Sequence, residues 1–295
     1  MMSENICSIL SASLCSYGIG EPGGVRGNRF APGVGFTDAP IAPFTAGPDQ
    51  IDACYVADTP DNVILAFRGT SIGQDGNERQ VIIDLLNDFL AKPVVVNGIG
   101  TLHQGFAGSV ERLWKKGFQN EVQKRMTNGN PLIITGYSKG AALAPIAAAF
   151  LHKKLSIEAD RMIIRIFEPP RPGDGAFAKY FNKTFRTALR YEYQDDIVPH
   201  VPPVKAVAEL LSKIPFIGEI LAKYQDIDEW DYTSVGKLQF VNWDDEIVDD
   251  SPRLARERFE HLGVLVAEGK ILKMGAEHMP CGHIYNVLCR KDCPN

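Results

Sequence analysis

Apolar residues gather in short runs that predict the strands of a sheet. The runs at 51–57 and 62–68 are separated by a polar segment, 58–61, so they predict two strands joined by a tight turn. The runs at 131–135 and 162–167 are nearly continuous in Ile, Leu and Met, which is typical of parallel strands buried on both faces. Two further strands are expected at 187–193 and 237–243.

Helical patterns lie between and around these strands, at residues 104–128, 138–153, 174–182 and 251–268. Strands that alternate with helices indicate an α/β fold with a mainly parallel central sheet. Residues 1–50 are expected to form an N-terminal helix and a Gly- and Pro-rich wrap around the body. We therefore expect residues 1–295 to fold as a single domain.

Two segments are additions to this alternation. Residues 71–89 begin polar and turn apolar, and are expected to form a lid-like segment. In 204–224, apolar residues recur at steps of three and four, an amphipathic helical pattern that Pro215 and Gly218 should break or kink. Ordinary helices packed on the core would give the same two patterns.

Composition excludes several classes of protein. The 295 residues carry 31 Lys+Arg and 36 Asp+Glu, a net charge of −5, and 45% of them are hydrophobic. A disordered chain would be less apolar, and a nucleic-acid binder would present a basic face. The sequence also lacks the CxxC and HExxH patterns of zinc sites, so we expect neither a metal nor an organic cofactor.

The termini and the cysteines bear on the compartment. The N-terminus lacks the basic and apolar pattern of a secretory leader, and no apolar run approaches the length of a membrane span. We therefore expect a cytoplasmic protein. If a leader was removed, we expect a secreted one. For cytosolic chains the usual state of cysteine is the free thiol. In an oxidising compartment, the three cysteines near the C-terminus could instead staple that tail. The six cysteines are Cys7, Cys15, Cys54, Cys281, Cys289 and Cys293.

A candidate nucleophile lies at Ser138, within Gly-Tyr-Ser-Lys-Gly at 136–140. The pentapeptide follows a predicted strand and precedes an Ala-rich helix, which is the strand–turn–helix context of the G-x-S-x-G nucleophile elbow. The flanking glycines let strand and helix approach closely. The helix N-terminus places backbone N–H groups where they favour a developing anion.

A serine nucleophile needs a histidine base, and the histidine needs a carboxylate that holds its tautomer. Asp195 and Asp196 end the predicted strand 187–193, where loops build sites in α/β sheets. His278 and His283 lie in a loop after the last predicted helix. The residues alone leave both pairs open. Two other histidines are less suited, since His152 follows the elbow too closely and His261 sits inside a helix.

Several stretches together resemble the fungal-type class 3 lipase family of α/β-hydrolases, in the order in which that family carries them. The resemblance covers roughly residues 51–288. The stretches are Ala66-Phe67-Arg68-Gly69-Thr70-Ser71, Asp84-Leu85-Leu86-Asn87-Asp88, Leu102-His103-Gln104-Gly105-Phe106, Gly136-Tyr137-Ser138-Lys139-Gly140, Pro170-Arg171-Pro172-Gly173-Asp174 with Phe177-Ala178, and Asp195-Asp196-Ile197-Val198-Pro199.

The resemblance implies a role for each matching residue. It makes Ser138 the nucleophile, selects Asp196 as the acid because the family's acid directly precedes Ile-Val-Pro, and favours His283, which opens a His-x-Tyr, with His278 as the fallback. It implies an oxyanion hole formed by the backbone N–H groups of Thr70 and Lys139. A change to the Lys139 side chain should then cost little, because its backbone does the work.

The chain departs from the family pattern without losing any of these residues. Glu168 stands where the family usually has Gly, Pro172 replaces a usual Val, and His200 replaces a usual Arg. The 71–89 segment is longer than the family's lid, and 204–224 resembles an insertion after the acid loop. Both additions are expected near the mouth of the site.

The resemblance implies acyl transfer from an ester to water. Triacylglycerol lipase is the favoured activity, with 71–89 and 204–224 covering an apolar acyl pocket and opening at lipid interfaces. Phospholipase A1, short-chain esterase and feruloyl esterase share the same site. A lipase-like scaffold that binds partners without catalysis is the alternative of another class. The expected partner is a lipid or other ester substrate, with no nucleic acid and no transmembrane segment.

Overall fold

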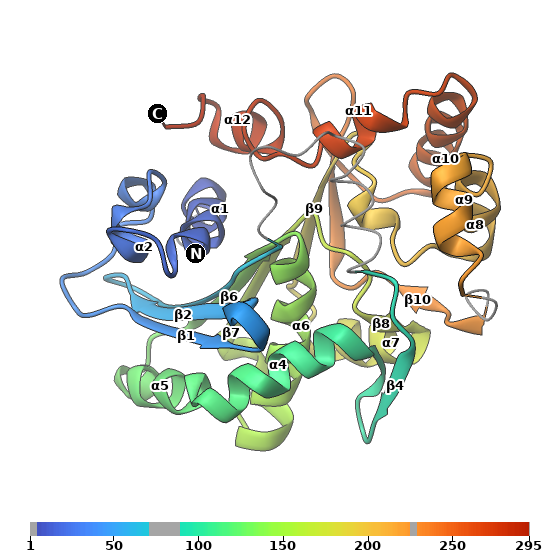
Figure 1. Ribbon diagram of the computed structural model, residues 1–295. Helices are drawn as coiled ribbons and strands as arrows, with labels where there is room; N and C mark the ends of the chain where they lie inside the picture. Colours follow the sequence, from blue (N-terminus) through green and yellow to red (C-terminus); the bar gives the residue numbers. More distant parts are fainter. Residues whose placement is uncertain (1–4, 71–88, 225–228, 295) are drawn as a thin grey trace.

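A mixed sheet that is mostly parallel forms the centre of the molecule (Figure 1). The computed structural model describes residues 5–70, 89–224 and 229–294. Within them the larger sheet contains eight strands in the order β1-β2-β3-β6-β7-β9-β11-β12. Strands β3, β6, β7, β9 and β11 run parallel, and β1, β2 and β12 add antiparallel edges. The predicted α/β class with a mainly parallel sheet is confirmed.

The strand predictions agree closely with the observed bounds. The two strands joined by a tight turn are the antiparallel pair β2 and β3. The strands of the larger sheet are β1 (Ala42–Ala46), β2 (Asp52–Asp58), β3 (Val63–Phe67), β6 (Leu132–Tyr137), β7 (Met162–Phe167), β9 (Leu189–Tyr193), β11 (Lys237–Val241) and β12 (Ile247–Asp249). Of these strands, the sequence pattern missed the edge strands β1 and β12.

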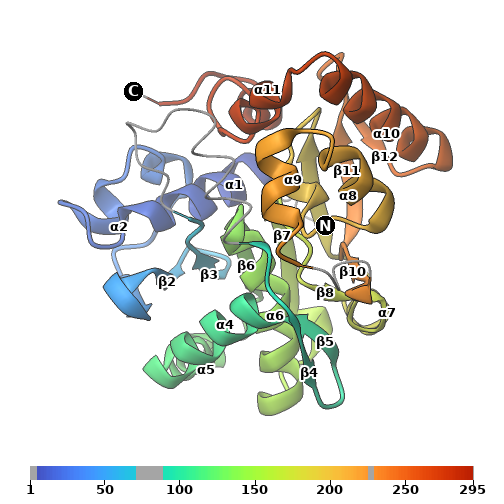
Figure 2. The ribbon, with the colours of Figure 1, turned by 45° about the vertical axis from the view of Figure 1, so that its right-hand side comes forward.

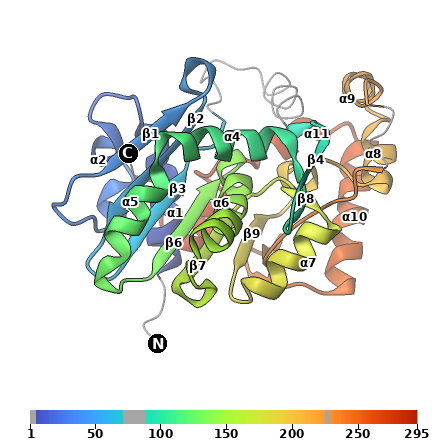
Figure 3. The same ribbon diagram turned by 90° about the horizontal axis from the view of Figure 1, so that it is seen from below.

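The sheet separates two apolar layers, because successive side chains of a strand point to opposite faces. In β2, Cys54 and Val56 join one layer, whereas Ala53 and Tyr55 join the other. Helices α4 (Gln104–Lys116), α5 (Phe118–Arg125), α6 (Lys139–Leu155) and α7 (Gly175–Thr184) lie together on the first face (Figure 3). The predicted 104–128 helix is thus two helices, which Gly117, at φ 95°, separates.

The opposite face is covered by the two ends of the chain (Figure 1). Helix α1 (Ile6–Cys15), expected within the first 50 residues, packs against α12 (Ile284–Cys289). The short helix α2 (Gly24–Gly27) and the 3-10 turns Ser16–Gly18, Ala31–Gly33 and Pro48–Gln50 lie in the wrap. Three further 3-10 turns are Met126–Asn128, Ala159–Arg161 and Val198–His200.

The predicted addition at 204–224 is a pair of short helices, α8 (Lys205–Leu211) and α9 (Pro215–Leu221). Pro215 opens the second helix, so it breaks the pattern where expected. Together with α10 (Pro252–Ala267) they lie at one end of the molecule (Figure 2). Apolar residues of both short helices, such as Leu211 and Ile217, join the same apolar layer as α6. The lid-like segment 71–89 lies outside the described residues except for Phe89, which is buried.

A second, smaller sheet has no counterpart in the sequence pattern. Its strands, in the order β10-β8-β5-β4, are two to four residues long. They are β4 (Pro93–Val96), β5 (Gly100–His103), β8 (Gly173–Asp174) and β10 (Tyr232–Thr233). No helix of the described residues is long and apolar enough to cross a bilayer.

Two disulfides correct the expectation of free thiols. Cys7 is bonded to Cys289 and Cys281 to Cys293, whereas Cys15 and Cys54 are free and buried. The cysteines near the C-terminus therefore do staple that tail. Bonds of this kind form and persist in oxidising compartments.

The bond between Cys7 and Cys289 should contribute strongly to stability, because it joins residues 282 positions apart and so restricts the unfolded chain. Replacing both by serine is expected to lower the free energy of unfolding by about 2–5 kcal/mol. The matched control replaces Cys281 and Cys293, which close a loop only 12 positions long and should cost less. Urea unfolding of the three proteins measures both losses. Equal losses would contradict the loop-length argument.

Candidate active site

The ends of neighbouring parallel strands deliver the polar residues of the site. Ser138 follows β6, Glu168 follows β7, and Asp195 and Asp196 follow β9. Because β6, β7 and β9 are adjacent and parallel, these residues share one edge of the sheet. A histidine reaches the same edge from the loop after α11 (Ile271–Ala276).

Ser138 sits in a strained turn between β6 and α6, with φ 56° and ψ −130°. Its backbone N–H donates to the Phe167 carbonyl over 3.0 Å. A Cβ on Gly136 would lie 2.2 Å from the Gly140 carbonyl carbon, and one on Gly140 would lie 2.2 Å from the Phe67 carbonyl oxygen. Only glycine therefore fits at either flank, as the elbow interpretation requires.

Ser138, His278 and Asp196 form a continuous hydrogen-bonded chain. The Ser138 Oγ lies 2.7 Å from His278 Nε2, and His278 Nδ1 lies 2.7 Å from Asp196 Oδ2. The other oxygen, Asp196 Oδ1, accepts the Val198 N–H over 2.9 Å. None of the three residues is more than 2% exposed. The imidazole is therefore placed to accept the serine proton on one nitrogen while the carboxylate holds the proton on the other.

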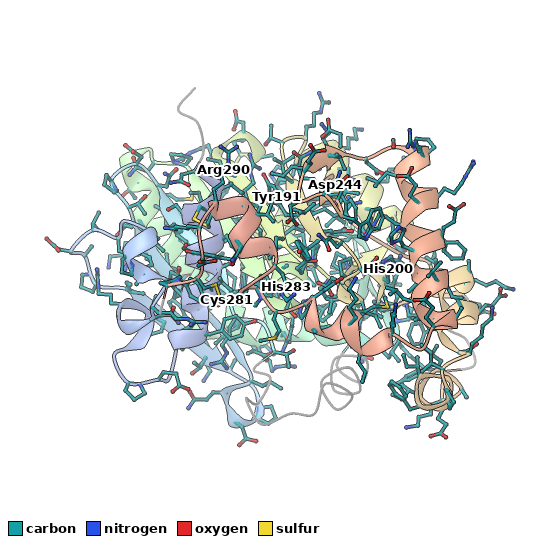
Figure 4. All side chains as sticks on the ribbon, turned by 90° about the horizontal axis from the view of Figure 1, so that it is seen from above. Tyr191, His200, Asp244, Cys281, His283 and Arg290 are labelled. Carbon is teal, nitrogen blue, oxygen red and sulfur yellow. A yellow bond between two sulfur atoms is a disulfide. The ribbon has the colours of Figure 1, made fainter. Side chains whose placement is uncertain are left out.

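The choice of His283 over His278 is wrong. His283 opens α12, and its Nδ1 lies 3.0 Å from the Met279 carbonyl oxygen rather than near Ser138. Figure 4 places its side chain beside Cys281, at the start of that helix. Both histidines lie in one loop, but His278 comes two residues after α11, where the chain still faces the sheet edge. The fallback of the sequence argument is the residue that the fold brings to Ser138.

Tyr137 holds the histidine loop in place. Its hydroxyl donates to the His278 carbonyl over 2.6 Å, and the two rings lie 5.4 Å apart. Burial raises the pKa of Tyr137 well above its ordinary value, so the hydroxyl keeps the proton that it donates. The residue before Ser138 thus fixes the backbone of His278. The sequence carried no signal for this contact.

The second aspartate has separate partners. Asp195 accepts hydrogen bonds from the Trp243 indole at 3.1 Å and from the Lys273 ammonium at 3.3 Å. Its backbone N–H donates to Glu277. Asp195 therefore ties the acid loop to α11 and the segment after β11, and the geometry agrees with the selection of Asp196 as the partner of the histidine.

The expected oxyanion residues lie next to the nucleophile. Lys139 is the first residue of α6 and directly follows Ser138. A Cβ on Gly69, the neighbour of Thr70, would come within 3.2 Å of the Ser138 Cβ. The Lys139 ammonium is turned away toward Asp52, 3.2 Å distant, so only its backbone is available at the site.

Tyr17 supports the loop that carries Thr70. Its buried hydroxyl hydrogen-bonds the backbone of Gly69. Burial raises the pKa of Tyr17, so this hydroxyl also stays protonated at neutral pH. The N-terminal region thereby contacts the site, which the expectation of a wrap did not include.

Residues 64–206 match the family described as Lipase (class 3). A lipase of Rhizopus niveus is 33% identical over 152 residues, which make up 50% of this chain and 36% of that relative. Phospholipase A(1) DAD1, chloroplastic, of Arabidopsis thaliana is 25% identical over 190 residues, 60% of this chain and 42% of the relative. The chain thus spans about two fifths or less of the length of these curated relatives.

Solved structures extend the likeness to most of the chain. A triacylglycerol lipase whose catalytic centre is a serine protease triad superimposes with a TM-score of 0.60 at 19% identity, covering 82% of each chain. Lipase II from Rhizopus niveus gives a TM-score of 0.57 at 21% identity, covering 78% of this chain and 76% of its own. These likenesses confirm the α/β-hydrolase fold.

Proposed function

We propose that this chain, which belongs to the class 3 lipase family, is a serine carboxylic-ester hydrolase that acts on lipid esters, most of all triacylglycerols. The observation that carries the proposal is the chain of two 2.7 Å contacts from Ser138 through His278 to Asp196. Such a constellation serves acyl transfer through a covalent intermediate. The reaction needs no metal and no organic cofactor.

The steps follow from the positions of the side chains. His278 Nε2 accepts the proton of Ser138 as its oxygen attacks the ester carbonyl carbon. The carbonyl oxygen becomes an anion that accepts hydrogen bonds from the backbone N–H groups of Thr70 and Lys139. The imidazolium, held by Asp196, then protonates the departing alcohol and leaves an acyl-serine. Water, deprotonated by the same histidine, releases the acid and restores Ser138.

Three features favour lipid esters over short, soluble ones. The relatives named above are lipases and a phospholipase A(1). The triad is at most 2% exposed, so little bulk water surrounds it, which suits the ester of an apolar acyl chain. Helices α8 and α9 carry an apolar stripe that includes Val207, Leu211 and Ile217, and these helices could line an acyl pocket. Phospholipase A1, short-chain esterase and feruloyl esterase remain alternatives that the same triad would serve.

The two disulfides favour a secreted protein over the cytoplasmic one that the sequence suggested. A non-catalytic scaffold is disfavoured, because the strained backbone of Ser138 and the burial of a charged Asp196 would serve no purpose in a binding surface.

Hydrolysis of p-nitrophenyl esters from acetate to palmitate, with and without detergent micelles, tests the proposal. We expect activity that rises with chain length and with the presence of an interface. A phosphonate ester that mimics the tetrahedral intermediate should label one serine per chain, at Ser138 by mass spectrometry. A short-chain optimum would favour the esterase alternative. No hydrolysis and no label would favour the scaffold.

A further inference from the structure

Glu168 is a buried acid that the steps above do not use. It follows β7, between the strands that carry Ser138 and Asp196, and it is 0% exposed. Neither of its carboxyl oxygens receives a hydrogen bond from a donor among the described residues. Buried carboxylates are normally paired with donors or cations, so an unpaired one costs free energy and calls for an explanation.

The backbone of Glu168 adds a second cost. Its φ of 50° lies in the left-handed region, which favours glycine and is strained for other residues. The conformation is set by the neighbouring strand, because the Glu168 N–H donates to the Tyr191 carbonyl over 2.9 Å. A glycine would fit there without strain and would bury no carboxyl group. That the position carries a glutamate indicates that the side chain has a role.

The side chain of Glu168 meets the acid of the triad. Its carboxyl group lies within hydrogen-bonding reach of Asp196, which already accepts from Val198 and holds His278. Two carboxyl groups within hydrogen-bonding reach of each other share a proton. Because Asp196 has these donors and Glu168 has none, the negative charge belongs on Asp196 and the proton on Glu168.

Most of the other charged and titratable groups near Glu168 support this assignment, and the exception is the Arg258 guanidinium, which lowers the pKa of Glu168. Glu192 on β9 is a second negative charge, and it is already paired with Arg190 and Arg258. Tyr137 and Tyr193 face Glu168 from β6 and β9, and their raised pKa values keep both neutral at neutral pH. Burial, followed by the charge of Asp196, raises the pKa of Glu168 well above its ordinary value.

We propose that Glu168 is a positioning residue whose protonated carboxyl group donates a hydrogen bond to Asp196 and so fixes the carboxylate that holds His278. The inference rests on the proposed hydrolase function. Glu168 never touches the ester. It acts by keeping Asp196 Oδ2 aimed at His278 Nδ1, and it keeps a second negative charge away from Asp196. When Glu168 ionises at alkaline pH, the two carboxylates repel each other and the alignment is lost.

Two variants of similar size separate these roles. Glu168→Gln keeps a donor but cannot ionise, and Glu168→Met keeps the volume without a donor. We expect Glu168→Met to lower kcat by about 10- to 100-fold with KM little changed, since one hydrogen bond to a charged group is lost. Glu168→Gln should retain kcat within a few fold at neutral pH and should lack the alkaline loss of activity of the wild type. The measurement is kcat and KM from neutral to alkaline pH.

Thermal unfolding tests the protonation without any substrate. A raised pKa in the folded protein means that the folded chain binds a proton that the unfolded chain releases. The contribution of Glu168 to stability is thus fully present below the ordinary glutamate pKa and is lost as pH rises through the folded-state pKa. We expect the Tm of Glu168→Gln minus the Tm of the wild type to increase as pH rises through that range.

The outcomes separate this inference from the proposed function. If the wild type hydrolyses esters, and the Glu168→Gln and Glu168→Met variants have the same kcat and the same pH profile as the wild type, the positioning role alone is overturned. If Glu168→Met does not fold, an alkaline limb in Glu168→Gln identical to that of the wild type would still overturn it. A wild type without esterase activity would instead refute the proposed function, and a Tm difference independent of pH would refute the protonated carboxyl group.

Discussion

Replacing His278 by alanine is expected to lower kcat for ester hydrolysis by about a millionfold, the order of loss seen when a serine nucleophile loses its base. The reason is geometric, since His278 Nε2 is 2.7 Å from the Ser138 oxygen and is the acceptor for its proton. Ser138→Ala should cause a loss of the same order. The double variant should lose little more, because the two residues act as one unit.

The matched control is His283→Ala, in the same loop. His283 contacts the Met279 carbonyl and stacks edge-on against Tyr193, with ring centroids 5.5 Å apart, so its loss should leave kcat within a few fold of wild type. Single-turnover and steady-state hydrolysis of one p-nitrophenyl ester by the wild type and the four variants would decide. Retained activity in His278→Ala, or loss confined to His283→Ala, would show that the catalytic base is not the histidine in contact with Ser138.

Gly140→Ala, next to the nucleophile turn, is expected to be strongly destabilising. The added Cβ would lie 2.2 Å from the Phe67 carbonyl oxygen and 2.8 Å from its carbon, which are backbone atoms of a central strand. They cannot turn aside as a flexible side chain can, so either β3 or α6 must shift. We expect a loss of about 4 kcal/mol or more in the free energy of unfolding, in the range reserved for severe overpacking.

A second glycine supplies the control. Gly263 lies within α10, and a Cβ there would meet nothing within 4 Å. Gly263→Ala should raise the free energy of unfolding by about 0.5–1 kcal/mol, because alanine favours the helix. Urea titrations of the two variants, with phosphonate labelling of Ser138 to report on the nucleophile, provide the comparison. Equal stability of the two variants would contradict the close approach of α6 to β3.

The position of Ser138 could be predicted from a local pattern, whereas the residues narrowed the acid only to Asp195 or Asp196 and the family resemblance selected Asp196. Ser138 lies between glycines, after an apolar strand and before an Ala-rich helix, and Asp196 follows the end of a strand. The base could not be predicted from the residues, because His278 and His283 share one loop. Which of them turns inward depends on contacts from distant parts of the chain, such as the Tyr137 hydroxyl, 141 positions away.

Parts of the fold were out of reach for the same reason. Strands β8 and β10 are two residues long, too short for any alternation of polar and apolar positions to appear. They form because β5 and α7 bring their backbones together. The pairing of Cys7 with Cys289 likewise depends on α1 lying against α12, which no local pattern encodes. In the sequence, Glu168 stood out only as a departure from a family pattern. Its contact with Asp196 could not be predicted, because it depends on β7 lying between β6 and β9.

The bond between Cys7 and Cys289 also closes residues 7–289 into a covalent ring. A single proteolytic cut in any loop between these residues leaves both fragments covalently attached to each other. The cut ends can separate only where the loop lay, while α1 and α12 stay together and the sheet stays assembled. Where proteases are present, one cut would therefore not release a fragment until the disulfide was reduced.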